Sequence, residues 1–408
     1  MRGNELQALG KLAGDAVGRP ASLAGGIHSA VAGRTFKALG ILGAPARFVH
    51  DGISGAAYRG VTSAIAAPAR AGASALARRI APDAPGLADS PRGSIALGAL
   101  NGAFGEALPG ELSLELTLRR NGREVVTDSA GLASAYPDAT PKLAVFVHGL
   151  CETEAAWHIG ARPGYGYRLK GELGYTPVDV RYNTGLHVSD NGRRLAQVLD
   201  QLVAAWPVEV EQIALVGHSM GGLVARSACH YGETTGHRWT DSLRHVFCLG
   251  TPHLGAPMEK AANLFGWALG RLPETRPFAD LVNVRSAGIK DLRYGSCVEE
   301  DWCDCDPDEF LRDRCNEVPF LPNATYYFVG ATLSRRPGGP YGSLVGDLLV
   351  RFPSASGSGR KRRIPFEIDN GIHVGGITHF HLLNHPAVYD QLRTWLSREP
   401  AGLPAQAM

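Results

Sequence analysis

The spacing of apolar residues along the chain predicts helices first, a hairpin next, and then alternating strands and helices. From Val49 to Ile65 an apolar residue recurs at every fourth position, which places these side chains on one face of a helix. Four prolines between positions 45 and 85, Pro68 among them, predict helix ends. Residues 111–127 alternate instead, and Asn121-Gly122 between the two apolar runs predicts a β-hairpin with a type I′ turn.

Short apolar runs that predict strands alternate with helical patterns from residue 142 onward. The strands are expected at 143–147, 178–182, 213–216, 246–249, 326–329 and 364–368, with helices at 195–206 and 386–397. This alternation predicts a mostly parallel sheet with helices on both faces, whose functional residues follow the carboxyl ends of the strands. Residues 252–322 lack a predicted strand, and we expect a lid insertion there.

Length and charge divide the chain into two parts. The 408 residues suffice for a helical extension, expected at 1–100, and an α/β domain at 101–400. Residues 1–80 hold ten Lys/Arg and three Asp/Glu, a net charge of +7 in a chain whose total is +2. This charge predicts peripheral contact with an anionic membrane through residues 1–100, and packing against the α/β domain is the alternative. Because aromatic residues and known reading motifs are scarce there, nucleic acid is not an expected partner.

The chain shows no apolar run of about 18 residues that would span a membrane. Its first twenty residues have scattered charges and no signal-peptide pattern. The expected location is therefore cytoplasmic, peripheral to a membrane.

The segment Gly217-His218-Ser219-Met220-Gly221 joins a predicted strand to a predicted helix. A G-x-S-x-G sequence in that context is typical of the nucleophile elbow of an α/β hydrolase, with Ser219 as the nucleophile. The backbone N–H of Met220 would then serve the oxyanion hole, and Leu150, after the strand at 143–147, would supply the second N–H.

An acid and a base are expected later in the chain, in that order. Asp347 follows the strand at 326–329 and is the predicted acid, with Asp369 as the alternative. His379 and His381 both follow the last predicted strand, as do His373 and His385, and spacing alone does not separate them.

Three segments together resemble the lipase-like α/β hydrolases, in particular the branch similar to the GPI inositol-deacylase. They are Val147-His148-Gly149-Leu150, the stretch from Gly217 to Arg226, and Gly250-Thr251-Pro252-His253-Leu254-Gly255-Ala256-Pro257. The resemblance covers roughly 142–397 and implies Asp347 in a G-D-x-L-V segment and His379 in an H-x-x-L-L-x-x-P segment. At the acid it departs from the pattern, since Leu348 replaces the more usual glycine.

The resemblance implies hydrolysis of carboxylic esters, here an acyl ester or lipid, through Ser219, His379 and Asp347 with no metal or other cofactor. A thioesterase or acyltransferase is the alternative on the same fold, and an inactive membrane-associated binding or scaffold protein is the alternative of another class. We expect His148, Trp157, His218 and Leu254 near a substrate pocket.

Four cysteines lie close together in the predicted lid: Cys297, Cys303, Cys305 and Cys315. Their spacing fits no standard zinc site. Reduced thiols, disulfides and a bound metal remain alternatives. By contrast, Cys229 and Cys248 lie in apolar surroundings and are predicted to be buried.

Overall fold

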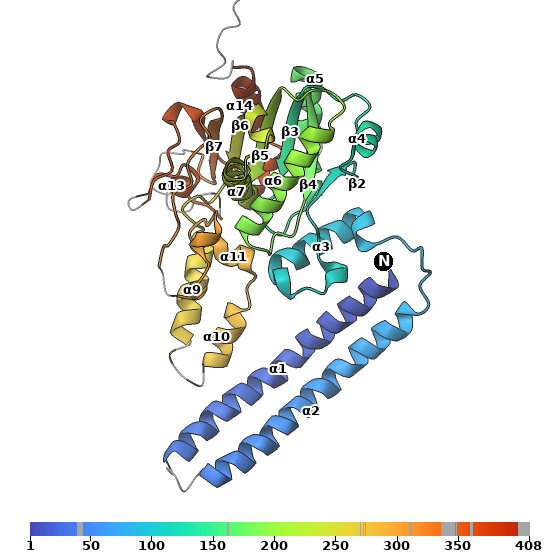
Figure 1. The fold of residues 1–408 in the computed structure, drawn as a ribbon. Coiled ribbons are helices and arrows are strands. Elements are labelled where there is room, and N and C mark those ends of the chain that lie inside the picture. Colours follow the sequence, from blue (N-terminus) through green and yellow to red (C-terminus); the bar gives the residue numbers. More distant parts are fainter. Residues whose placement is uncertain are drawn as a thin grey trace, which may run out of the picture. The chain divides into compact units, whose positions relative to one another are not determined.

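A mostly parallel β-sheet forms the centre of the larger part of the chain (Figure 1). The computed structural model describes residues 1–38, 44–160, 163–269, 271, 273, 275–309, 312–335, 347, 349–359 and 362–398. Within these residues the sheet has eight strands in the order β2-β1-β4-β3-β5-β6-β7-β8. Their bounds are β1 Thr117–Arg120, β2 Arg123–Val125, β3 Lys142–Val147, β4 Tyr175–Arg181, β5 Gln212–His218, β6 Leu243–Leu249, β7 Thr325–Thr332 and β8 Gly371–Gly375.

The strand pairing confirms the predicted hairpin and parallel sheet. β1 pairs antiparallel with β2 and with β4, and the strands from β4 through β8 pair in parallel. In the hairpin turn, Asn121 has φ 52° and Gly122 has φ 74°, the two positive angles of a type I′ turn. The strand predicted at 364–368 was wrong, because Pro365 lacks an N–H for the ladder and the last strand is β8 instead.

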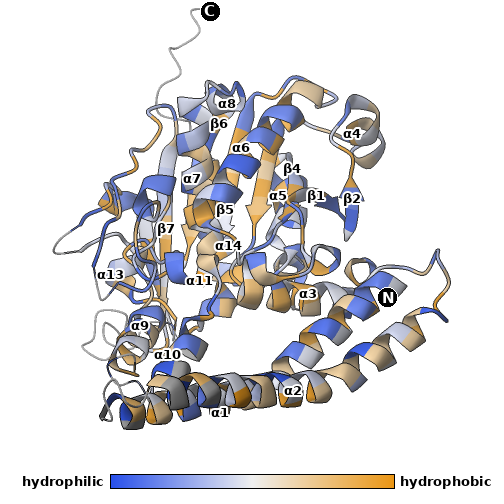
Figure 2. Ribbon diagram, turned by 60° about the horizontal axis from the view of Figure 1, so that its bottom comes forward, coloured by the Kyte–Doolittle hydropathy of each residue, from blue (hydrophilic) through white to orange (hydrophobic). Residues whose placement is uncertain are grey.

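Alternate residues of the strands enter two hydrophobic cores, one on each face of the sheet. Val145 and Leu215 point into the core under α6 and α7, whereas Phe146 and Val216 point into the core under α5 and α14. The central strand β5 is accordingly coloured as hydrophobic in Figure 2, whereas the edge strand β2 is hydrophilic. The covering helices are α4 Ser129–Ala135, α6 Val188–Ala205, α7 Met220–Thr234 and α8 Trp239–Ser242 on one face, and α5 Tyr165–Leu173 and α14 Pro386–Leu396 on the other.

Between β6 and β7 the described residues contain helices and turns but no strand, as expected for 252–322. The helices there are α9 Pro257–Leu269, α10 Arg276–Asn283 and α11 Ala287–Asp291. Two further helices, α3 Pro91–Phe104 and α13 Phe352–Ala355, lie outside this interval.

The chain forms two compact units. One comprises Met1–Ser90, Leu108–Leu112 and Ala261–Arg285, and the other contains the sheet. The first is built on a pair of long helices, α1 Gly3–Ala38 and α2 Ala44–Ala77. None of the helices in the described ranges is both long and apolar enough to cross a membrane.

Glycines on α1 bring the two long helices into close contact. A Cβ added to Gly10 would lie 2.2 Å from the Ala73 Cβ, and one added to Gly18 would lie 2.8 Å from the Thr62 Cγ2. The prediction that Pro68 ends a helix was wrong, because Pro68 lies inside α2. Packing against α1, with neighbouring Ala66 only 1% exposed, offsets the hydrogen bond that the proline removes.

Candidate active site

Ser219 occupies a strained turn between β5 and α7. Its φ of 52° and ψ of −121° are unfavourable for any residue with a Cβ. The turn is tight because a Cβ at Gly221 would lie 2.2 Å from the Val147 carbonyl oxygen, and one at Gly222 would lie 2.0 Å from the Thr251 Oγ1. This is the geometry of a nucleophile elbow, with the half-buried serine at the carboxyl end of a central strand.

His379 and Asp347 form a buried hydrogen-bonded pair. The His379 Nδ1 lies 2.7 Å from one Asp347 carboxylate oxygen, and the two residues are 2% and 1% exposed. The other carboxylate oxygen accepts the N–H of Leu349 at 3.0 Å and that of Val350 at 2.8 Å. Because the carboxylate accepts from Nδ1–H, the ring proton sits on Nδ1, and the buried Nε2 has no hydrogen-bond partner within the described residues.

The alternative acid, Asp369, and the three alternative bases make no contact of this kind in the described residues. Asp369 is exposed, and the His381 Nδ1 accepts the Thr378 N–H at 3.1 Å. His373 stacks on the Phe352 ring with centroids 3.9 Å apart, while the His385 N–H donates to the Tyr165 hydroxyl at 2.8 Å. Among the predicted candidates, the structure brings together only Asp347 and His379.

The loop after β3 approaches Ser219, and the N–H groups on either side of Leu150 have acceptors. A Cβ at Gly149 would lie 3.1 Å from the Ser219 Cβ. The Gly149 N–H donates to Glu152 Oε2 at 2.7 Å, and the Cys151 N–H donates to Thr184 Oγ1 at 3.1 Å. Leu150 lies between them, and its N–H contacts no acceptor in the described part of the chain.

Met220 is the other residue whose N–H is predicted to serve an oxyanion hole. It is the first residue of α7, and the first N–H groups of a helix have no acceptor one turn earlier. The positive end of the helix dipole lies at the same place. The N–H groups of Leu150 and Met220 are thus both available to an anionic oxygen.

Sequence analysis missed Glu152, which contacts His218, the residue before Ser219, and has a side chain that is only 10% exposed. Its Oε2 faces the His218 Nδ1 at 3.1 Å. Burial by itself would raise the pKa of Glu152, but the charge of His218 and the hydrogen bonds from His218 and the Gly149 N–H lower it to about 2. The only sequence signal was an acid three residues after Gly149.

Of the four residues expected near a substrate pocket, His148, Trp157 and His218 lie at the loop after β3 and the nucleophile turn. His148 and His218 are fully buried, and Trp157 is 2% exposed. The Trp157 ring contacts those of Phe146 and His218, with centroids 5.1 and 6.2 Å apart. Leu254 is half-buried and its N–H donates to the Ser354 Oγ at 3.1 Å. His148, Trp157 and His218 are therefore buried side chains rather than exposed pocket walls.

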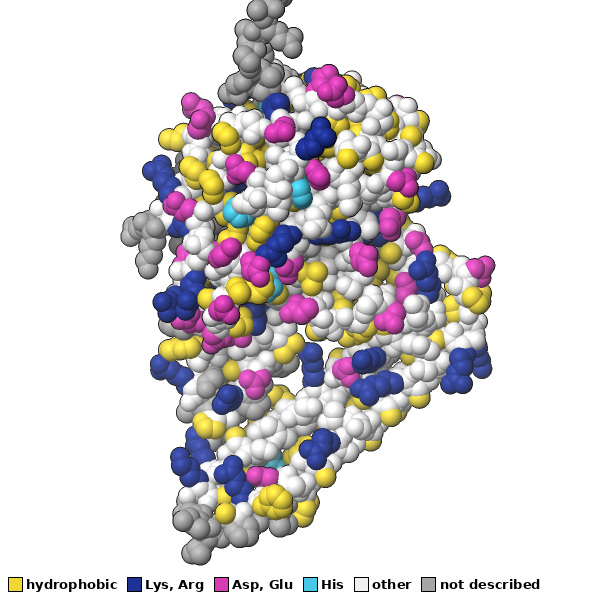
Figure 3. Space-filling view, viewed as in Figure 1, with side chains coloured by type: hydrophobic (Ala, Val, Ile, Leu, Met, Phe, Trp, Pro, Cys, Tyr) yellow, Lys and Arg dark blue, Asp and Glu magenta, His cyan; other side chains and the backbone are white. Residues whose placement is uncertain are grey.

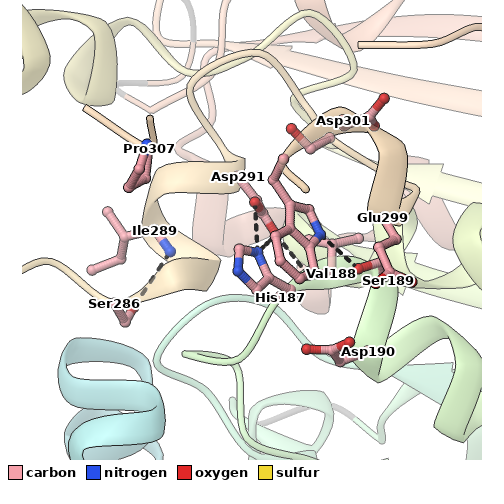
Figure 4. Close-up of polar contacts among 12 residues, drawn as sticks. His187, Val188, Ser189, Asp190, Ser286, Ile289, Asp291, Glu299, Asp301 and Pro307 are labelled. Atoms are coloured by element: carbon pink, nitrogen blue, oxygen red, sulfur yellow. Dashed lines mark hydrogen bonds and ion pairs between the residues drawn. The ribbon is translucent and has the colours of Figure 1, made fainter. Parts of the chain in front are cut away.

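A second histidine–aspartate pair holds the start of α6 to the segment around α11 (Figure 4). The His187 Nδ1 lies 3.1 Å from both Asp291 carboxylate oxygens, and the Val188 N–H donates to Asp291 at 2.8 Å. The His187 ring stacks on Trp302 with centroids 3.7 Å apart, and the Trp302 Nε1–H donates to the Ser189 Oγ at 2.9 Å. These contacts fix the segment that contains the clustered cysteines.

All seven cysteines are free thiols. Cys229 and Cys248 are buried as predicted, and of the clustered four, Cys297 is buried and Cys303 is exposed. Within the described residues no group of three or more His, Cys, Asp or Glu side chains is arranged to hold a metal ion.

The strand order, the parallel pairing and the helices on both faces of the sheet define the fold as that of an α/β hydrolase. Residues 187–307, less than half of the chain, match the family described as "PGAP1-like alpha/beta domain". That segment is therefore similar to the family that the sequence motifs resemble.

Solved lipase and esterase structures are similar to the chain at low scores. Bacillus licheniformis lipase BlEst2 in mature form is 20% identical, with a TM-score of 0.42, over 62% of this chain and 91% of that one. Aspergillus fumigatus lipase B is 11% identical, with a TM-score of 0.40, over 71% and 58%. EstA from Clostridium botulinum is 13% identical, with a TM-score of 0.39, over 78% and 99%. At these scores the structural similarities carry no argument about the activity of this chain. No curated protein matches it.

Proposed function

We propose that the protein is a serine hydrolase that cleaves carboxylic esters, lipid-like acyl esters in particular, with Ser219, His379 and Asp347 as its triad. The observation that carries this proposal is the buried Asp347–His379 pair, whose Nε2 has no partner in the described residues. A neutral histidine oriented by a carboxylate, with its second nitrogen free, is the base that a serine nucleophile needs.

The reaction would follow from these positions. The His379 Nε2 takes the hydroxyl proton of Ser219 as Oγ bonds to the acyl carbon, and Asp347 stabilises the imidazolium that forms. The Leu150 and Met220 N–H groups donate to the oxyanion, each contributing on the order of 10²–10³ in rate. His379 then protonates the leaving alcohol, and water releases the acyl group by the same steps.

The test is covalent labelling by a fluorophosphonate together with hydrolysis of p-nitrophenyl esters from acetate to palmitate. We expect the wild type to react with both and Ser219→Ala with neither, while the exposed-serine control Ser397→Ala behaves as wild type. Rates that rise with chain length support a lipid-like ester. Labelling without hydrolysis favours the acyltransferase or thioesterase alternative, and a wild type that reacts with neither probe contradicts the proposal and favours an inactive binding protein.

We also propose that residues 1–100 contact anionic membrane surfaces. The pair α1–α2 exposes large apolar side chains, including Phe48 at 83% and Ile53 at 68%. Figure 3 shows Lys and Arg side chains interspersed with hydrophobic ones over α1 and α2, and residues 1–80 carry a net charge of +7. Apolar side chains interspersed with basic ones are typical of helices that lie in a membrane interface.

A further inference from the structure

The Glu152 carboxylate connects the loop after β3 to the nucleophile turn. One oxygen, Oε2, accepts the Gly149 N–H at 2.7 Å and also faces the His218 Nδ1 at 3.1 Å. The Glu152 side chain is 10% exposed and that of His218 is fully buried. Both side chains are therefore removed from bulk solvent, and a charge buried in this way needs a specific partner.

Both ring nitrogens of His218 face oxygen atoms that only accept. Nδ1 faces the Glu152 carboxylate at 3.1 Å, and Nε2 faces the His379 backbone carbonyl at 3.3 Å. A neutral imidazole carries one N–H, so satisfying both acceptors requires the doubly protonated ring. His218 is therefore an imidazolium paired with the Glu152 carboxylate.

Another buried histidine, His148, has a donor facing one ring nitrogen and an acceptor facing the other. Its Nδ1 faces the Gly149 carbonyl at 3.0 Å, while its Nε2 lies 3.4 Å from the Tyr182 N–H, a donor. One nitrogen donates and the other accepts, so His148 is neutral. Burial lowers the pKa of His148, in agreement with this assignment.

We propose that Glu152 and the His218 imidazolium form a positioning pair for the ester hydrolysis proposed above, on which this inference rests. The pair joins three segments in one line of hydrogen bonds, from the Gly149 N–H through Glu152 and His218 to the His379 carbonyl. These segments carry the Leu150 donor, the Ser219 nucleophile and the base. Neither residue exchanges a proton with the substrate.

Because the pair depends on the charge of His218, it sets an upper pH limit on the reactivity of the site. Burial lowers the pKa of His218, but the charge and hydrogen bond of Glu152, the His379 carbonyl and the charge of Asp347 raise it overall. The His379 ring, 4.8 Å away between centroids, and the Trp157 ring also face His218. A group whose pKa is raised keeps its stabilising charge at low pH and loses it as pH rises through that value.

Glu152→Gln tests the positioning role because it keeps the shape and removes the charge. We expect the alkaline limit of fluorophosphonate labelling to move about one to three pH units lower, the range for losing an opposite charge beside a titrating group. The matched control is Glu154→Gln, a buried carboxylate two residues away that pairs with Arg181, with Nε to Oε2 at 2.6 Å. Its alkaline limit should stay at that of wild type, because arginine does not titrate in this range.

Nitrogen NMR of histidine-labelled full-length protein decides the charge state without requiring activity. With the His218 signals assigned by their loss in His218→Asn, we expect both ring nitrogens of wild type to be protonated at neutral pH. A neutral His218 ring overturns the inference while leaving the hydrolase proposal intact, as does a Glu152→Gln profile whose limit is unchanged. If wild type is neither labelled nor active, the hydrolase proposal fails and the positioning role fails with it.

Discussion

At the scale of single residues, the tautomer of His379 decides whether Ser219 can be activated. One Asp347 oxygen accepts from the His379 Nδ1 at 2.7 Å, and the other is held by two backbone N–H groups. In Asp347→Asn, the amide oxygen would accept the two backbone N–H groups, so the NH₂ group would face Nδ1. Nδ1 would then have to accept, which moves the ring proton to Nε2 and blocks proton transfer from serine.

We therefore expect Asp347→Asn to reduce kcat by about 10⁴, the magnitude found when the acid of a serine triad becomes an amide. Ester hydrolysis measured beside a matched Asp369→Asn variant checks this, since Asp369 is the exposed alternative acid and its change should leave kcat unaltered. A loss of kcat in Asp369→Asn but not in Asp347→Asn would reverse the assignment.

Sequence alone could locate some of these residues and not others. Ser219 was evident because a local motif and its flanking strand and helix specify it. His379 and His381 lie two positions apart, and only the family spacing favoured His379, which the contact with Asp347 then supports. Glu152 was missed because its partner His218 is distant in sequence, and no local pattern encodes that contact.

At the scale of elements, the contact between α1 and α2 depends on small residues. Gly10 faces Ala73, where an added Cβ would lie 2.2 Å from the alanine Cβ, whereas Gly72 has no atom within 4 Å of such a Cβ. We expect Gly72→Ala to stabilise α2 by about 0.5–1 kcal/mol, because alanine loses less backbone entropy. In Gly10→Ala the same gain is opposed by an overpacking cost of about 1–3 kcal/mol.

Hydrogen exchange of the α1 and α2 amides in the full chain measures both effects. Protection should rise in Gly72→Ala and fall in Gly10→Ala, although the two substitutions are chemically identical. Equal rises in both variants would show that the helices do not meet at Gly10.

The His187–Asp291 pair makes another element sensitive to pH. Burial lowers the pKa of His187, but the hydrogen bond and charge of Asp291 raise it overall. Its stabilising charge is therefore fully present below the unfolded-state value, about 6.5, and is lost as pH rises through the raised value. We expect the free energy of unfolding of wild type to exceed that of His187→Ala by about 1.5–3 kcal/mol at low pH, the range for hydrogen bonds to charged groups.

Urea midpoints of the two proteins between pH 5 and about pH 9 test this dependence. The difference in unfolding free energy between wild type and His187→Ala should become smaller as pH rises. A difference that stays constant across the range would mean that His187 acts only through stacking on Trp302.

Elements were predicted best where the pattern was long. The apolar runs from 142 identified most of the parallel strands because both faces of that part of the sheet are buried. The alternation in 111–127 with Asn121-Gly122 at its centre identified the hairpin. The last strand was misplaced because β8 is short and glycine-flanked, with five half-buried residues. Pro68 failed as a helix end because packing of α2 against α1 overrides local propensity.

At the scale of the whole molecule, the positive charge of residues 1–80 would bring the proposed esterase to an anionic membrane surface, where lipid esters occur. We expect the full-length protein to sediment with phosphatidylglycerol vesicles and not with phosphatidylcholine vesicles, because residues 1–80 carry a net +7, and to be released by salt. Replacing both Phe48 and Ile53 by serine should weaken binding about tenfold or more, since each loses apolar area that a bilayer would cover.

The control is Ile368→Ser in the sheet-containing unit, where Ile368 is as exposed as Phe48, each at 83%. Equal binding of the double variant and wild type, or equal weakening by Ile368→Ser, would show that the α1–α2 pair is not the surface that meets the membrane.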